Sequence, residues 1–178
     1  KAVFQITHGM IEYIERYEPF AEFMTEHGFM VVGHDHIGHG HSVKSDKDYG
    51  YFPKDDPSGV LVSDMHTLRT IIQKENPDMP YFMFGHSMGS YMLRKYLSIY
   101  GNGISGALIC GTGYVSARTT GFGLFLIGLA AKIHGGHYRS QTITNMTYNR
   151  SYRKFDMTGK DSKNSWLTRD SEIVENYC

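Results

Sequence analysis

The chain has 178 residues and a mass of 20.2 kDa, with 40% hydrophobic and 20% charged residues, which is typical of one globular domain with a small insertion. Its aromatic content, unpatterned glycines and lack of a sustained heptad exclude disorder, collagen and coiled coil. Because 18 basic side chains balance 18 acidic ones, no nucleic-acid partner is expected.

Short apolar runs alternate with helical periods from the start of the chain, a pattern typical of a mainly parallel sheet flanked by helices. Strands are expected at residues 2–7, 29–32, 81–84 and 104–110. Helices are expected around residues 17–24, 61–76 and 88–100, with a polar surface loop at 43–59. The pattern changes after Gly113, where an apolar helix at 122–133 is expected and no clear strand. We therefore expect an α/β core at 1–113 and an inserted helical lid at 114–178.

The sequence Gly85-His86-Ser87-Met88-Gly89 matches G-x-S-x-G. It follows one expected strand directly and precedes one expected helix, which is the setting of a nucleophile elbow. The two glycines allow a tight turn in which the Ser87 hydroxyl projects above the sheet. This context favours Ser87 as a catalytic nucleophile over an idle serine in a glycine-rich turn.

An acyl-transfer enzyme also needs rigid N–H donors for the oxyanion of its tetrahedral intermediate. The N–H of Met88, at the start of the following helix, is one candidate. The second candidate is the N–H of Met10, because Gly9 allows the chain after the first strand to turn sharply toward Ser87. Taken alone, His8-Gly9-Met10 is better read as an ordinary strand-ending turn.

Four features together resemble the monoacylglycerol lipase and lysophospholipase branch of the α/β-hydrolases, also called serine aminopeptidase-like hydrolases. They are the HG-x-x-E opening at 8–12, the Arg16-Tyr17 pair, the D-x-x-GHG-x-S loop at 35–42 and GHSMG at 85–89. A fifth segment, at 166–170, is similar to the end of that family's lid. The resemblance implies that Ser87 is the nucleophile, that the N–H groups of Met10 and Met88 form the oxyanion hole, and that a helical lid covers an acyl-chain tunnel.

The triad of this fold follows the order serine, acid, histidine. After Ser87 the histidines are His134 and His137, and no Asp or Glu precedes either of them. The first later acid is Asp156, and no histidine follows it. We therefore expect that the chain alone cannot catalyse, and that it is a fragment whose missing segments complete the sheet and supply the acid and histidine.

Two groups of residues invite other interpretations. The histidine-rich loop at 34–41 and the His134–His137 pair have spacings that can chelate zinc, but the loop is explained by the resemblance and the pair has no acid or thiol nearby. Gly111-Thr112-Gly113 lacks the third glycine and the later acidic residue of a dinucleotide site. No metal and no cofactor is therefore expected.

Charge is distributed unevenly along the chain. Residues 1–78 carry a net charge of −6, residues 79–155 a net of +8 with no acidic side chain, and residues 156–178 a net of −2. This is either an uneven solvated surface or a positive field suited to anionic lipid or a carboxylate product. In the second case, the protein should prefer anionic or zwitterionic lipid esters, and Lys132→Glu combined with Arg139→Glu should weaken that preference. The effect should be larger at low salt, where exposed charges are screened less.

Targeting signals are weak. The first ten residues lack the basic flank and long apolar run of a secretory signal, and the apolar stretch 121–131 is too short to span a bilayer. That stretch fits the interior of a lid, or transient contact with an acyl chain or a membrane surface. Two cysteines, Cys110 and Cys178, are too few for a disulfide framework and favour a reducing compartment. A soluble, cytoplasmic protein is expected.

The function expected from these observations is that of a serine hydrolase that cleaves carboxylic esters of single-chain lipids, such as lysophospholipids or monoacylglycerols, through an acyl-enzyme on Ser87. Two alternatives stay open. One is a non-catalytic module that binds lipid or another ligand on the hydrolase scaffold, and the other is a peptidase or short-chain esterase of the same fold.

Overall fold

The computed structural model describes residues 1–52, 55–145, 152, 154–156, 158 and 160–177. Cys178 lies outside these residues, as do Arg150 and Arg153, two of the basic side chains that give residues 79–155 their positive charge. The chain divides into two compact units, Lys1–Val115 and Ser116–Cys178, and each is described by itself.

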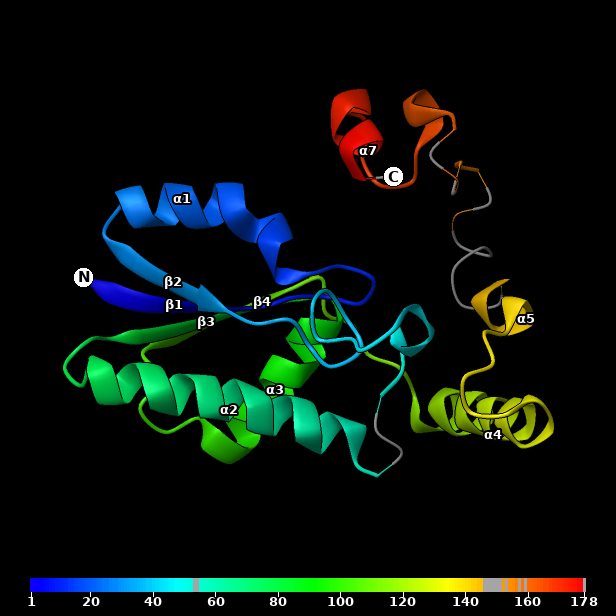
Figure 1. Ribbon diagram of the computed structural model, residues 1–178, viewed down its shortest axis with the longest axis horizontal. Coiled ribbons are helices and arrows are strands. Elements are labelled where there is room, and N and C mark those ends of the chain that lie inside the picture. The colour runs from blue at the N-terminus through cyan, green and yellow to red at the C-terminus, as the bar shows by residue number, and fades with distance from the viewer. Residues whose placement is uncertain (53–54, 146–151, 153, 157, 159, 178) are drawn as a thin grey trace. The chain divides into compact units, whose positions relative to one another are not determined.

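The first unit is built on a four-stranded parallel sheet with the order β2-β1-β3-β4 (Figure 1). The strands are β1 (Ala2–Thr7), β2 (Phe29–Gly33), β3 (Tyr81–His86) and β4 (Gly106–Cys110). The central pair is β1 and β3, and Thr7 lies opposite Gly85 in their register. Because parallel strands end at the same edge, the turns after β1 and β3 lie next to each other. The predicted parallel sheet is thereby confirmed.

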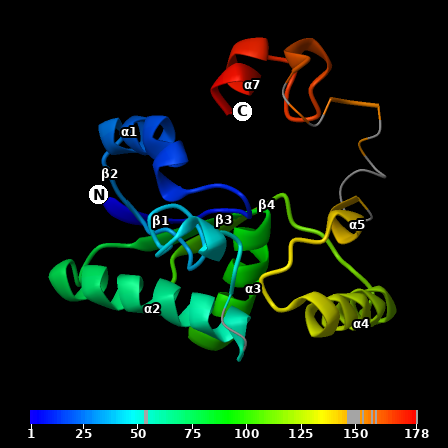
Figure 2. The ribbon, with the colours of Figure 1, turned by 45° about the vertical axis from the view of Figure 1, so that its right-hand side comes forward.

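Helices cover both faces of this sheet. The 3-10 turn η1 (Ile14–Tyr17) and helix α1 (Glu18–Glu26) lie on one face, and α2 (Pro57–Glu75) and α3 (Met88–Tyr100) lie on the other (Figures 1 and 2). The core between the sheet and α2 and α3 consists of large buried side chains, namely Val3, Val62, Met65, Tyr81, Met83, Leu93 and Tyr96. On the opposite face, Phe4 packs edge-on against Phe20 and stacks on Phe84. Both layers are apolar, as a parallel sheet requires.

A buried arginine joins α2 to the end of α3. The Arg69 guanidinium donates to the carbonyls of Tyr100 and Asn102, at 2.8 and 2.7 Å, and to the Gln73 side chain at 2.7 Å. It also reaches the Tyr96 hydroxyl at 3.3 Å. These bonds satisfy carbonyls at and just after the carboxyl end of α3, where a cation also complements the helix dipole.

Several predicted boundaries differ from the structure, among them the start of α4 at Ala117 rather than at residue 122, and two of the differences have a clear local cause. The expected surface loop at 43–59 contains the 3-10 turn η2 (Asp46–Asp48) and the first turn of α2. The helix begins early because the Asp56 carboxylate accepts the Gly59 N–H at 3.0 Å and Pro57 occupies the first helical position. The fourth strand begins at Gly106 rather than at residue 104, since the Ile104 N–H instead closes a turn on Gly101.

The second unit is helical in the residues that can be described. It contains α4 (Ala117–His134), α5 (Gln141–Thr144), the 3-10 turn η4 (Ser162–Asn164) and α7 (Ser171–Tyr177), with one isolated bridge between Asp156 and Ser165. Helix α4 is capped by the Ser116 hydroxyl and exposes six large apolar side chains, Phe122, Leu124, Phe125, Ile127, Leu129 and Ile133. No helix among the described residues is long and apolar enough to cross a membrane.

Candidate active site

Ser87 lies in the tight turn between β3 and α3. Its backbone has φ +49° and ψ −117°, a conformation that a residue with a side chain rarely adopts and that costs free energy. Hydrogen bonds hold the turn from two sides. The Ser87 N–H donates to the Cys110 carbonyl of β4 at 3.0 Å, and the Ser87 carbonyl accepts the Ser90 hydroxyl at 2.6 Å. The half-buried serine is therefore fixed at the carboxyl end of the sheet.

Close backbone approach explains the two glycines around this serine. A Cβ at Gly85 would lie 2.6 Å from the Gly89 carbonyl oxygen, and a Cβ at Gly89 would lie 2.1 Å from the Thr7 carbonyl oxygen. Real Cβ atoms do not approach backbone so closely. The absence of side chains at 85 and 89 thus lets α3 start directly against the end of β1.

The turn after β1 lies beside Ser87. A Cβ at Gly9 would be 3.1 Å from the Cβ of Ser87, so the backbone at residue 9 runs close to the serine. Met88 is the first residue of α3, where backbone N–H groups have no partner within the helix. Ser87, Met88 and the turn that carries Met10 are thus gathered at one edge of the sheet. The assignment of the Met10 and Met88 N–H groups as oxyanion donors stays a prediction.

A buried carboxylate, Glu12, connects this turn to the residue before the nucleophile, His86. Its side chain is 6% exposed, and Oε1 accepts hydrogen bonds from the Gly9 N–H, from the Tyr17 hydroxyl at 2.9 Å and from the His86 Nδ1 at 3.1 Å. Its Oε2 lies 3.5 Å from the Arg16 guanidinium. One carboxylate therefore ties together the turn after β1, the 3-10 turn η1 and the end of β3.

The electrostatics of Glu12 follow from these contacts. Burial alone would raise the pKa of the Glu12 carboxyl, but hydrogen bonds from His86, Gly9 and Tyr17 outweigh it and lower the pKa below its ordinary value. Burial, followed by the nearby Glu12 charge, raises the pKa of the Tyr17 hydroxyl well above its usual range. The tyrosine is therefore a neutral donor and Glu12 a charged acceptor at neutral pH.

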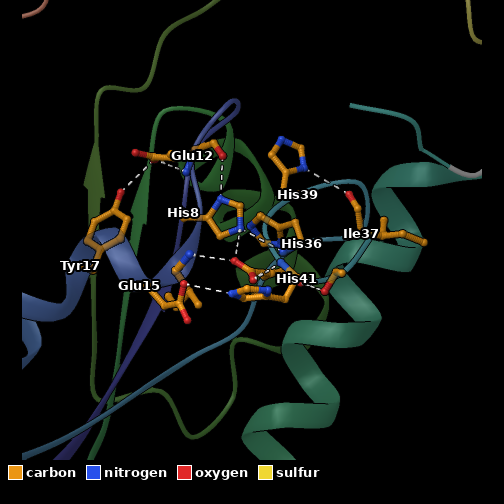
Figure 3. A network of polar contacts seen from close by, with 12 residues as sticks. His8, Glu12, Glu15, Tyr17, His36, Ile37, His39 and His41 are labelled. Carbon is orange, nitrogen blue, oxygen red and sulfur yellow. Dashed lines mark hydrogen bonds and ion pairs between the residues drawn. The ribbon is translucent and has the colours of Figure 1, made fainter. Parts of the chain in front are cut away.

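Behind the turn lies a buried cluster of imidazole rings. The His8 ring centroid is 4.2 Å from that of His36 and 5.4 Å from that of His39 (Figure 3). His8 Nε2 accepts the His36 N–H at 2.9 Å, so its Nδ1, 2.7 Å from the Gly9 carbonyl, carries the proton and donates. Burial lowers the pKa values of His8, His34 and His36, so these rings are neutral.

Asp35 shapes the loop that carries these histidines. One carboxylate oxygen accepts the Ile14 N–H and the other accepts the His41 N–H, both at 2.8 Å, while the Asp35 carbonyl accepts the Ser42 hydroxyl at 2.9 Å. These bonds give the aspartate and serine of the loop a structural role. Among the described residues, no group of three or more His, Cys, Asp or Glu side chains is arranged to hold a metal ion.

The linking role of Glu12 and His86 was not predicted from the sequence. Glu12 and the Arg16-Tyr17 pair were recognised only as parts of a motif, and His86 only as a variable position in G-x-S-x-G. The available signal was the spacing: a carboxylate three residues after Gly9 can fold back onto its N–H. Within the described residues of 1–115, no histidine nitrogen bonds the Ser87 hydroxyl; both ring nitrogens of His8 have other partners, and His86 Nδ1 bonds Glu12.

Comparison with known proteins decides the family. The profile described as "Serine aminopeptidase, S33" matches the chain over residues 1–178. The chain belongs to this serine aminopeptidase S33 family. The predicted resemblance to α/β-hydrolases of the monoacylglycerol lipase type is therefore confirmed at the level of the family.

Curated relatives of this S33 chain include monoglyceride lipases. The monoglyceride lipase of Rattus norvegicus is 34% identical over 89 residues, which cover 50% of this chain and 27% of that protein. The monoglyceride lipase homolog of Monkeypox virus is 38% identical over 90 residues, or 51% of this chain and 30% of that protein. The chain thus matches less than a third of the length of these relatives.

A solved structure matches almost the whole S33 chain. The thermostable carboxyl esterase from Bacillus coagulans, solved in complex with glycerol, is 31% identical with a TM-score of 0.78. The match covers 99% of this chain and 56% of the esterase. The predicted α/β-hydrolase fold is confirmed, and the chain corresponds to about half of such a molecule.

Proposed function

We propose that the protein is a serine hydrolase that cleaves carboxylic esters of single-chain lipids, of the lysophospholipid or monoacylglycerol type. The observation that carries the proposal is the backbone of Ser87, which has φ +49° at the end of a central strand and lies beside the turn at residue 9. Backbone strain concentrates at functional residues, and this turn presents a nucleophile at the edge of the sheet. The monoglyceride lipase and carboxyl esterase names of its relatives support an ester as the substrate.

In the proposed reaction the Ser87 oxygen attacks the ester carbonyl and loses its proton to a general base. The N–H groups of Met10 and Met88 donate to the oxyanion, each contributing about 3 kcal/mol by comparison with a similar site. The carbon–oxygen bond of the ester then breaks, and the alcohol leaves with a proton. Water releases the acid from Ser87 by the same steps. The general base and its acid are not among the residues that this proposal assigns.

Labelling with a fluorophosphonate probe tests the nucleophile. The intact wild-type enzyme, including the segments expected to supply the acid and histidine, should be labelled at one serine, and Ser87→Ala should abolish labelling. Ser98→Ala is the matched control, because this exposed hydroxyl on α3 bonds only the carbonyl of its own helix. Labelling that persists in Ser87→Ala contradicts the proposal.

A second candidate is a module that binds lipid without turnover. The observation that favours it is the absence of a histidine bond to the Ser87 hydroxyl within the described residues of 1–115. A panel of p-nitrophenyl esters separates the two functions, because a binding module gives neither a burst of nitrophenol nor turnover. A parallel panel of aminoacyl p-nitroanilides tests peptidase activity, which the family name suggests.

The second unit supports lipid as the substrate class. The apolar side chains that α4 exposes suit contact with an acyl chain or a membrane surface, and Arg118 and Lys132 near the helix ends suit anionic headgroups. We propose that residues 114–178 act as a lid. Lys132→Glu combined with Arg139→Glu should lower the ratio of activity on lysophospholipid to activity on a short neutral ester. An unchanged ratio at low salt contradicts this role.

A further inference from the structure

The turn beside Ser87 contains an unusual residue, Ile11, whose backbone has φ +60°. The other described residues with a side chain and a positive φ are Asp56, a type that tolerates this region, and Ser87 itself. Isoleucine is branched at Cβ, which makes the left-handed region especially unfavourable for it. A residue of this type is kept there only if something offsets the strain.

The conformation itself has a clear structural reason. The chain reverses between Gly9 and Glu12, so that the Glu12 carboxylate returns to accept the Gly9 N–H. A left-handed residue within this reversal closes the turn. Glycine adopts that conformation without steric cost, so the turn explains the backbone at position 11 but not the isoleucine side chain.

Burial within the described residues does not offset the strain either. Ile11 is 71% exposed and its neighbour Met10 is 43% exposed. Two large apolar side chains therefore face solvent on the turn that approaches Ser87. Exposed apolar groups beside a nucleophile are suited to an apolar part of a substrate.

We propose that Ile11 is a specificity-determining residue that contacts the acyl chain of an ester bound at Ser87. The contact strengthens as the acyl chain lengthens, so the enzyme prefers long-chain over short-chain esters. The inference rests on the proposed ester hydrolase function and deepens it by assigning part of the acyl-chain site to this turn.

The test uses the intact enzyme and p-nitrophenyl esters, which keep one leaving group while the acyl chain varies, at concentrations where the esters are monomeric. Ile11→Gly should lower the ratio of kcat/KM for the decanoate to kcat/KM for the acetate by about 10-fold, the value of one apolar side chain in contact with substrate. Ile11→Val should lower it only slightly. Ile71→Ala, at an exposed position on α2, is the matched control and should keep the wild-type ratio.

Thermal unfolding of the same variants separates this role from packing. Because glycine relieves the strained backbone, Ile11→Gly should have a Tm equal to or above that of the wild type. A lower Tm with equal loss of activity on all esters identifies Ile11 as a packing residue and overturns the inference, as does an unchanged decanoate-to-acetate ratio. Hydrolysis that persists in Ser87→Ala refutes the proposed function instead.

Discussion

Replacing Glu12 by glutamine should destabilise the protein at neutral pH and loosen the turn beside Ser87. The carboxylate accepts three hydrogen bonds on Oε1, from Gly9, Tyr17 and His86. A hydrogen bond to a charged group contributes about 1 kcal/mol more than a bond to a neutral one, so the three together predict a loss of about 3 kcal/mol. The Arg16 contact at 3.5 Å is partly exposed and adds less than about 1 kcal/mol.

Urea unfolding of Glu12→Gln and the wild type at several pH values measures this loss. Since the folded pKa of Glu12 lies below its ordinary value of 4.5, its stabilisation is present above that value and is lost as the pH falls through the folded pKa. The difference between the two proteins should therefore shrink at acid pH. Glu15→Gln is the control, because the Glu15 side chain is 59% exposed. A Glu12→Gln protein as stable as Glu15→Gln at pH 7 refutes the reasoning.

Three further predictions follow from the packing and the buried charges. Gly89→Ala should lower the free energy of unfolding by at least about 4 kcal/mol, because its Cβ would collide with the Thr7 carbonyl. Gly121→Ala, in open space on α4, should instead raise it by about 0.5 kcal/mol. Thermal unfolding of the two variants compares these effects. Arg69→Met should lower the unfolding free energy by about 3 kcal/mol in urea titrations, because it removes the charged donor that bonds the part-buried Tyr100 and Asn102 carbonyls. The free energy of unfolding should also fall as the pH drops below about 6.5, since burial lowers the pKa of His36 in the folded protein. His36→Phe should make this dependence on pH less steep, whereas His41→Phe, at an exposed site, should leave it unchanged.

Local sequence signals predicted most of the core. The apolar run at 2–7 is followed by a glycine turn, and the apolar face at 88–100 ends before Gly101, so strand and helix limits there match the structure. The start of α2 was missed because polarity at 55–59 suggested a loop, although Asp56 before Pro57 is a helix-capping signal. The polar composition of this segment therefore gave less information than the position of Asp56 directly before Pro57.

The arrangement around the site was less accessible to sequence reasoning. The bond between Glu12 and His86 joins residues 74 positions apart, and only the pairing of β1 with β3 brings them together. The burial of His8 and His36 likewise depends on two separate strands meeting at one edge. The spacing of the histidines pointed to a loop beside the elbow rather than to a metal site, but periodicity and spacing could not show that these imidazole rings are buried, neutral and packed against one another.

The register of β1 against β3 has a kinetic consequence. Residues 9 and 87 become neighbours only when two strands separated by more than seventy residues pair, and closing so long a loop is slow compared with forming a helix. The environment of Ser87 should therefore appear late in refolding, after the helical signal. Pulsed reaction with a fluorophosphonate during refolding would report, through the fraction of Ser87 labelled at each time, when the two central strands pair.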